Sequence, residues 1–132
     1  MKARFLSCLT LGIVLGIVLL FVPGRVLAHH GTSSYDMTQW TTVTGAVTFV
    51  EWANPHVLVH FDVKDDQGNT QNWTADSPSP RHLVKEGWDK DTLKPGERIT
   101  VKGNRAKNGS NLMRLAWITR SDGQQLRGYT HF

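Results

Sequence analysis

Two adjacent histidines, His29 and His30, are the residues of this sequence best suited to binding a metal ion. If the chain began at His29, its α-amine and first imidazole would chelate one ion, and His30 would add a second imidazole. The pKa of an α-amine is about 7.7–8.0, so a metal displaces its proton close to neutral pH. Donor sets made of nitrogen alone favour copper, Cu(II), with Ni(II) or Zn(II) next. The alternative is a loose terminus that holds two histidines without a ligand.

The sequence before His29 predicts a secretory signal peptide over residues 1–28. Met1–Arg4 is basic, Phe5–Val22 is apolar and uncharged, and Val26-Leu27-Ala28 is typical of a signal-peptidase site. We therefore expect cleavage after Ala28 and a periplasmic location. The alternative is an uncleaved membrane anchor, because the length of the apolar run is at the lower limit for a membrane span.

Removal of this segment would change the charge of the protein. The whole chain has 15 basic and 11 acidic residues, a net charge of +4 and a pI near 9.5, which suggests a nucleic-acid ligand. Lys2, Arg4 and Arg25 lie in the predicted signal, so 12 basic residues would remain against 11 acidic ones, a net charge of +1. The only cysteine, Cys8, would also be removed. We therefore expect no nucleic-acid partner, no disulfide and no thiolate site.

A third histidine, His56, follows Trp52 in the run Asn54-Pro55-His56, at the predicted start of a strand. On a regular strand His56 and His60 are about 13 Å apart, too far to share one ion. A partner for His56 must come from another segment, and the N-terminus is one source. Asp36, close to that terminus, is a possible oxygen ligand. The alternative is that His56 only makes hydrogen bonds in its loop.

The elements that must position these residues are mostly strands. Alternating apolar residues predict the second strand, and Asp65–Asn69 predicts a hairpin turn after it. Ser79 and Pro80 predict the start of a short helix, and Gly87 its end. The expected strands are 41–52, 56–64, 70–76, 98–103 and 112–121, and the expected helix is 81–88.

This order predicts an all-β protein with one short helix, a small OB-like five-stranded barrel. The helix lies between the third and fourth strands, as in the OB fold. A small β-sandwich is the alternative. We expect residues 29–40 to form an N-terminal arm, 41–126 the OB-like barrel domain, and 127–132 a poorly anchored C-terminal tail.

Trp52, Asn54 and Trp88 give a second functional hypothesis, a rim that recognises a protein or a small polar ligand. The alternative for the tryptophans is a place in the core. The sequence lacks the H-E-x-x-H and G-x-S-x-G motifs and a phosphate-binding glycine loop. We therefore expect a binding protein and no enzyme.

Several motifs together resemble a family of small secreted bacterial proteins classed only as a domain of unknown function. The strongest are the double histidine and Trp52-x-Asn54-Pro55-His56. Gly31-Thr32 departs from the Ser–aromatic pair that follows the double histidine in that family. The resemblance implies a bacterial periplasmic location and supports pairing His29 and His30 with His56. The remaining matching motifs are Tyr35-Asp36, Gly45-x-Val47, Trp73, Ser77-Pro78, Gly87-Trp88, Leu93-Lys94-Pro95-Gly96 and Asp122-Gly123.

We therefore expect a periplasmic binding module that holds a copper-type ion through the processed N-terminal histidines and His56. The alternative is a metal-free accessory domain that binds a periplasmic protein or a small polar ligand. A membrane association is expected only if the signal is uncleaved.

Overall fold

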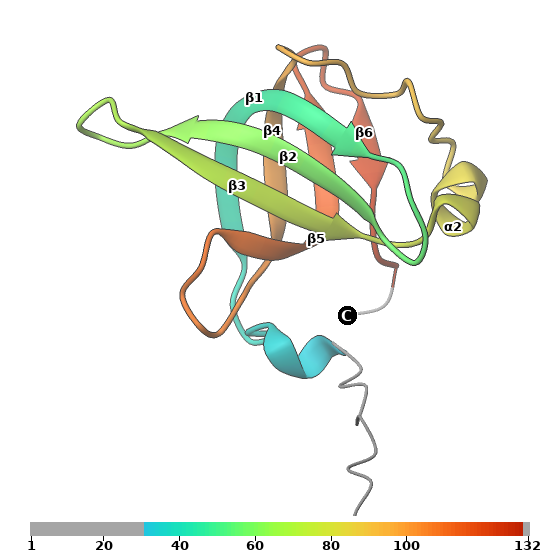
Figure 1. The fold of residues 1–132 in the computed structure, drawn as a ribbon, viewed down its shortest axis with the longest axis horizontal. Helices are drawn as coiled ribbons and strands as arrows, with labels where there is room; N and C mark the ends of the chain where they lie inside the picture. The colour runs from blue at the N-terminus through green and yellow to red at the C-terminus, as the bar shows by residue number, and fades with distance from the viewer. Residues whose placement is uncertain (1–30, 131–132) are drawn as a thin grey trace, which may run out of the picture.

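The computed structural model describes residues 31–130, which form a small β-barrel (Figure 1). Each of the five predicted strands begins within a residue of its expected position, because the alternation of apolar and polar residues is a local signal. In chain order the elements are η1 (Thr32–Ser34), β1 (Thr41–Glu51), β2 (Val57–Lys64), β3 (Thr70–Ser77), α2 (Pro80–Lys85), β4 (Arg98–Arg105), β5 (Leu112–Arg120) and β6 (Gln125–Arg127).

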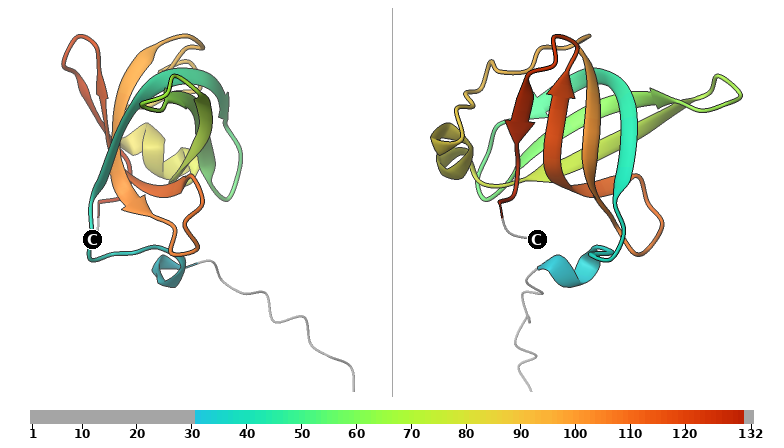
Figure 2. Two further views of the ribbon diagram at one scale, coloured as in Figure 1. Left: turned by 90° about the vertical axis from the view of Figure 1, so that its left-hand side faces the viewer. Right: turned by 180° about the vertical axis from the view of Figure 1, so that it is seen from behind.

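Five strands close the barrel, and the sixth lies at its edge. The strand order is β3-β2-β1-β4-β5-β6, with antiparallel neighbours. A parallel pairing of β3 with β5 joins the two sides of the sheet, so the first five strands surround the core (Figure 2). This order, with α2 between β3 and β4, confirms the predicted OB-like barrel.

The core is built from the inward-facing residues of the strands. On β2, Val57, Val59 and Phe61 are buried while the residues between them are partly exposed. Leu83 of α2 is fully buried in the same cluster, so the short helix contributes to the core. This packing removes apolar surface from water, the main stabilising term of a domain this small.

The helix is shorter than predicted. Pro80 is its first residue, as expected, but the side chain of Ser79 makes no capping hydrogen bond. Glu86 caps the C-terminal end, and Gly87 follows with φ of +86°. Glycine adopts this left-handed conformation without steric cost, which explains why the helix stops here.

The expectation of a poorly anchored tail after Leu126 is wrong. Leu126 is buried on β6, and beyond it the N–H groups of Gly128 and Tyr129 donate to carbonyl oxygens of β5. A single leucine in a polar segment gives too weak a pattern for a strand to be recognised. The chain is therefore hydrogen-bonded to the barrel as far as Tyr129.

Within residues 31–130, no helix combines the length and the apolar character needed to cross a bilayer. The predicted signal peptide and the pair His29-His30 lie outside the described residues.

Candidate functional site

His56 lies in the loop between β1 and β2, directly before β2 begins. The peptide bond between Asn54 and Pro55 in this loop is cis. The imidazole Nδ1 of His56 is 2.5 Å from the Oδ1 atom of Asp76, near the end of β3. The two residues meet because β2 and β3 are antiparallel, with Val57 opposite Ser77 and Leu58 opposite Asp76.

Asp76 points out of the barrel and is nevertheless buried. Its neighbours Ala75 and Ser77 face the core, so alternation directs the Asp76 carboxylate to the outer side of the wall. The parallel pairing of β3 with β5 sets Asp76 beside Arg114, which is also buried. Buried charges of this kind are stabilised only where partners surround them.

The N-terminal arm is the first of two segments that pack over Asp76. The hydroxyl of Tyr35 donates to Asp76 Oδ2 at 2.6 Å, and Tyr35 is only 5% exposed. The arm is fixed next to it, because Tyr35 forms a bridge with Ala106 and the N–H of Asp36 donates to the Arg105 carbonyl at 2.9 Å. The arm is thus bound to the barrel from Tyr35 onward.

The segment after β6 is the second segment that packs over Asp76. The hydroxyl of Tyr129 is 3.4 Å from Asp76 Oδ1 and equally far from His56 Nδ1. The guanidinium of Arg114 lies 3.8 Å from the centre of the Tyr129 ring. The arm and this C-terminal segment reach the same end of the barrel (Figures 1 and 2).

The tyrosine hydroxyls are held in the protonated form. Burial raises the pKa of Tyr35 well above its ordinary value, and the hydrogen bond to Asp76 raises it further. Burial likewise raises the pKa of Tyr129, as does the Asp76 charge. Burial lowers the pKa of Arg114, an effect that Tyr129 and Asp76 oppose. At neutral pH the tyrosines are therefore donors, and Asp76 is the acceptor they share.

This arrangement fixes the tautomer of His56. A carboxylate only accepts hydrogen bonds, so the Nδ1 atom facing Asp76 carries the proton. The lone pair of a neutral imidazole is then on Nε2. The side chain of His56 is 39% exposed, so this nitrogen is accessible to a ligand. A histidine oriented in this way by a carboxylate is a common metal ligand in proteins.

Asp36 does not join this group. Its Oδ1 atom accepts hydrogen bonds from the N–H and the hydroxyl of Thr38, at 3.0 and 2.6 Å, and these bonds lower its pKa. The residue lines a hollow of about 350 Å³ together with Arg105 and Lys107. Among residues 31–130, no three His, Cys, Asp or Glu side chains come together. The structure therefore does not bring Asp36 to His56 and Asp76.

The three rim residues have different environments. Asn54 is exposed in the loop before His56, and Trp52 is half-buried against the core. Trp88 is a core residue, only 3% exposed, whose indole N–H donates to the Arg127 carbonyl at 2.9 Å. Its assignment to an exposed rim is corrected, because the turn after α2 directs the ring into the barrel.

No sequence motif gives a functional role to Asp76, Arg114, Tyr35 or Tyr129. Arg114 carried one usable signal, a single cation inside the apolar run 112–118, which suggests a buried partner. Nothing local indicated that this partner is Asp76, because the contact depends on the closure of the barrel between β3 and β5.

A protein-family model described as "Family of unknown function (DUF6152)" matches residues 18–114. This range covers most of the chain. The chain belongs to the DUF6152 family. Tyr35, His56, Asp76 and Arg114 lie within the part that matches DUF6152, whereas β6 and Tyr129 lie beyond it. A comparison with curated proteins finds no match.

Proposed function

We propose that this DUF6152 protein is a secreted, periplasmic binding module that holds a copper-type ion through His56, His29 and His30. One observation carries the proposal: the Asp76 carboxylate binds Nδ1 of the half-exposed His56 and leaves Nε2 accessible. A carboxylate in this position orients the imidazole and makes it a stronger ligand.

The position of the N-terminal arm supports the choice of partners. Tyr35 is bound to the same carboxylate as His56, so the arm passes directly beside the site. His30 is five residues before Tyr35. A chain of that length spans at most about 18 Å, which is enough for His29 and His30 to approach His56. Nitrogen donors alone favour Cu(II) over Ni(II) and Zn(II). Asp36 is not part of this proposal.

The experiment begins with the full chain expressed with its own export signal. The intact mass of the exported product tests the predicted cleavage after Ala28. Calorimetric titration with Cu(II) then measures binding, and we expect one ion per chain. A Gly-Pro pair inserted before His29 should weaken binding at least tenfold, because the α-amine then moves away from the first imidazole and proline has no amide N–H that could be replaced by the metal. Equal affinity with the inserted pair would exclude the amine as a ligand.

Two substitutions and one control test the part of the site that the barrel contributes, His56 and Asp76. His56→Gln should weaken Cu(II) binding at least tenfold, whereas His60→Gln, on the outer side of β2, should not change it. Asp76→Asn should weaken binding by about 10–100-fold, the range found when the partner of a ligating histidine is lost. If the His56→Gln protein binds Cu(II) like the wild type, the proposal fails. The metal-free accessory domain, with Trp52 and Asn54 at its contact surface, is then the better hypothesis.

A further inference from the structure

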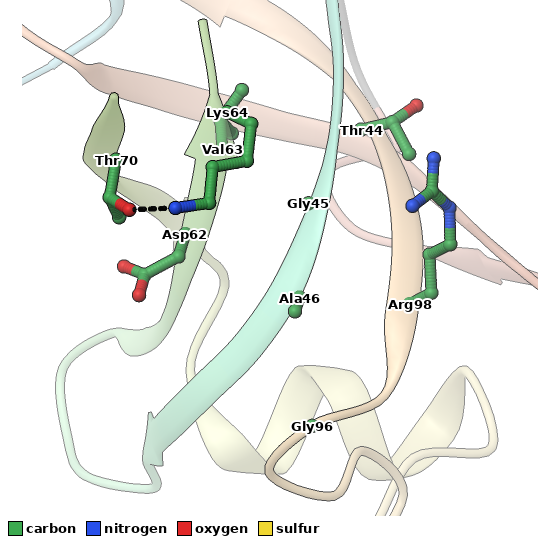
Figure 3. A pocket seen from close by; sticks show the side chains of 9 residues that line it. All are labelled: Thr44, Gly45, Ala46, Asp62, Val63, Lys64, Thr70, Gly96 and Arg98. Carbon is green, nitrogen blue, oxygen red and sulfur yellow. Dashed lines mark hydrogen bonds between the residues drawn. The ribbon is translucent and has the colours of Figure 1, made fainter. Parts of the chain in front are cut away.

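A hollow lies in the outer wall of the barrel, bordered by residues of β1, β2, β3 and β4 (Figure 3). Its volume is about 760 Å³. Small residues, Gly45, Ala46 and Gly96, lie along its base, and longer polar side chains stand on either side. The side chains that border it are those of Thr44, Asp62, Val63, Lys64, Thr70 and Arg98.

The hollow exists because two strands separate. β1 pairs with β2 from Ala46 onward, while the β2–β3 hairpin continues past this point and projects from the barrel (Figure 1). Lys64 and Thr70 stand on the projecting hairpin and are hydrogen-bonded at 2.5 Å, and Thr44 and Arg98 stand on the other side (Figure 3). The strand register therefore creates a site open to solvent.

A row of hydroxyl and amide side chains leads away from the hollow across four strands. Thr44 is opposite Thr100, Thr100 is opposite Thr119, and Thr119 is opposite Gln125. The hydroxyls of Thr44 and Thr100 are hydrogen-bonded at 2.9 Å. Adjacent strand residues such as Val101 and Ile118 are buried in the core, so this row faces outward.

A second row, next to the threonine row, carries two cations and one indole ring. Its members, in strand order, are Thr42, Lys102, Trp117 and Arg127. The guanidinium of Arg127 lies 4.7 Å from the centre of the Trp117 ring. The ammonium of Lys102 lies 5.0 Å from the ring of Trp40, which is 49% exposed. The face thus presents flat aromatic surface next to fixed positive charge.

The charge on this face is positive, although the predicted mature chain is nearly neutral. Arg98, Lys102 and Arg127 are exposed, and neither row contains a carboxylate. Two carboxylates at its borders already have partners, since Glu97 pairs with Arg120 at 2.5 Å and Asp62 accepts from Asn72 at 2.6 Å. An anionic ligand would meet cations with little opposing charge.

We propose that the outer face of β1, β4, β5 and β6, together with the hollow at its edge, binds an acidic polysaccharide, a chain of pyranoses that carry carboxylates. Arg98, Lys102 and Arg127 bind the carboxylates. The threonine row and Asp62 bind sugar hydroxyls, and the indole of Trp40 packs against a pyranose ring. This face differs from the strand 2–3 face that OB folds commonly use.

The alternatives fit this face less well. A membrane-binding surface inserts apolar side chains into the lipid, yet Trp40 is the one large, well-exposed hydrophobic residue on this face within the described chain. A nucleic acid needs many phosphate contacts, and the face together with its hollow offers four exposed cations, Lys64, Arg98, Lys102 and Arg127. Rows of hydroxyl and amide groups match a ligand rich in hydroxyls.

The test titrates the exported protein with oligogalacturonate and follows backbone amide shifts by NMR. Arg98→Gln, Lys102→Gln and Arg127→Gln combined should weaken binding at least tenfold. The matched control, Arg81→Gln, Lys85→Gln and Lys90→Gln, removes the same charge from exposed residues on and after α2 and should leave affinity within twofold. Trp40→Ala, at an exposed position, should weaken binding severalfold and leave the spectrum of the fold intact.

Three results would overturn the proposal. The first is an equal loss of affinity in the α2 control, which would show that only net charge matters. The second is equal binding of neutral dextran, which would remove the role of the carboxylates. The third is tighter binding of anionic phosphatidylglycerol vesicles or of single-stranded DNA through the same residues, which would assign the face to another class of partner.

Discussion

At the scale of single residues, Asp76 accepts hydrogen bonds from three separate segments of the chain. His56 reaches it from the β1–β2 loop, Tyr35 from the arm and Tyr129 from the segment after β6. A hydrogen bond to a charged group contributes about 1.5–3 kcal/mol when its partner is present, and an unpaired buried charge costs more. Asp76 therefore stabilises the fold only while its donors stay protonated.

The two tyrosines make this requirement measurable, because Tyr35 and Tyr129 are the only tyrosines in the chain. Their pKa values are raised in the folded protein. The ultraviolet absorbance of tyrosinate should therefore appear near pH 10 in urea, but only at higher pH in the native protein. In the same range the folded state keeps protons that the unfolded state loses, so the contribution of the two tyrosines to the free energy of unfolding should be constant below about pH 9 and fall above pH 10.

The double variant Tyr35→Phe, Tyr129→Phe is the control for this titration. It has no tyrosine, so the part of the alkaline fall in stability that comes from these hydroxyls should disappear. A native absorbance change at the ordinary tyrosine pKa would show that the hydroxyls are solvated, and would contradict the buried hydrogen bonds to Asp76.

At the scale of the elements, β1 and β2 approach closely at Gly45. A Cβ atom at this position would lie 2.3 Å from the carbonyl oxygen of Asp62, a backbone atom that cannot move aside alone. His56 directly precedes β2 and Asp76 lies on β3. Both strands are joined to β1 through the β1–β2 pairing, and the hollow begins on the other side of this contact. Gly45 thus sets the spacing on which both candidate sites depend.

Gly45→Ala should lower the free energy of unfolding by about 1–3 kcal/mol, the usual cost of overpacking. Urea denaturation followed by circular dichroism measures it. Thr42→Ala, at an exposed position of the same strand, should change it by less than about 0.5 kcal/mol. If the two variants were equally stable, the β1–β2 contact would be looser than the structure shows.

At the scale of the whole molecule, the N-terminal arm and the segment from β6 to Tyr129 pack next to the place where β3 pairs with β5. β6 adds a strand beside β5, and the backbone of Tyr129 is then hydrogen-bonded to Leu115, so its side chain can reach Asp76. The candidate metal site therefore requires the barrel, the arm and the C-terminal segment together.

Leu126→Ala tests whether β6 belongs to the cooperative fold. Leu126 is 5% exposed within the core cluster, so its truncation should cost about 2–5 kcal/mol in urea denaturation. Gln125→Ala, at the exposed neighbouring position, should cost less than about 0.5 kcal/mol. A small loss for Leu126→Ala would mean that the barrel folds without its sixth strand.

Much of the fold is encoded in short stretches of sequence. The alternation from Val57 to Val63 predicts β2 because strand periodicity is a property of neighbouring residues. The hairpin turn at 65–69 is likewise local, with Gly68 at φ of +83° and its N–H bonded to the Asp65 carbonyl. By contrast, β6 has a single apolar residue and forms only against β5, so its bounds are not encoded locally.

The sequence by itself determined the first five strands, the place of the helix and the presence of His56 directly before β2. It also showed which residues could bind metal if the signal is removed, since that chemistry depends only on residue types. The tertiary structure alone decided that Asp76 faces His56, Tyr35, Tyr129 and Arg114. The antiparallel pairing of β2 with β3 sets His56 beside Asp76, and closure of the barrel through the β3–β5 pairing adds Arg114. The arm and the segment after β6 then bring Tyr35 and Tyr129, which are far from Asp76 in sequence.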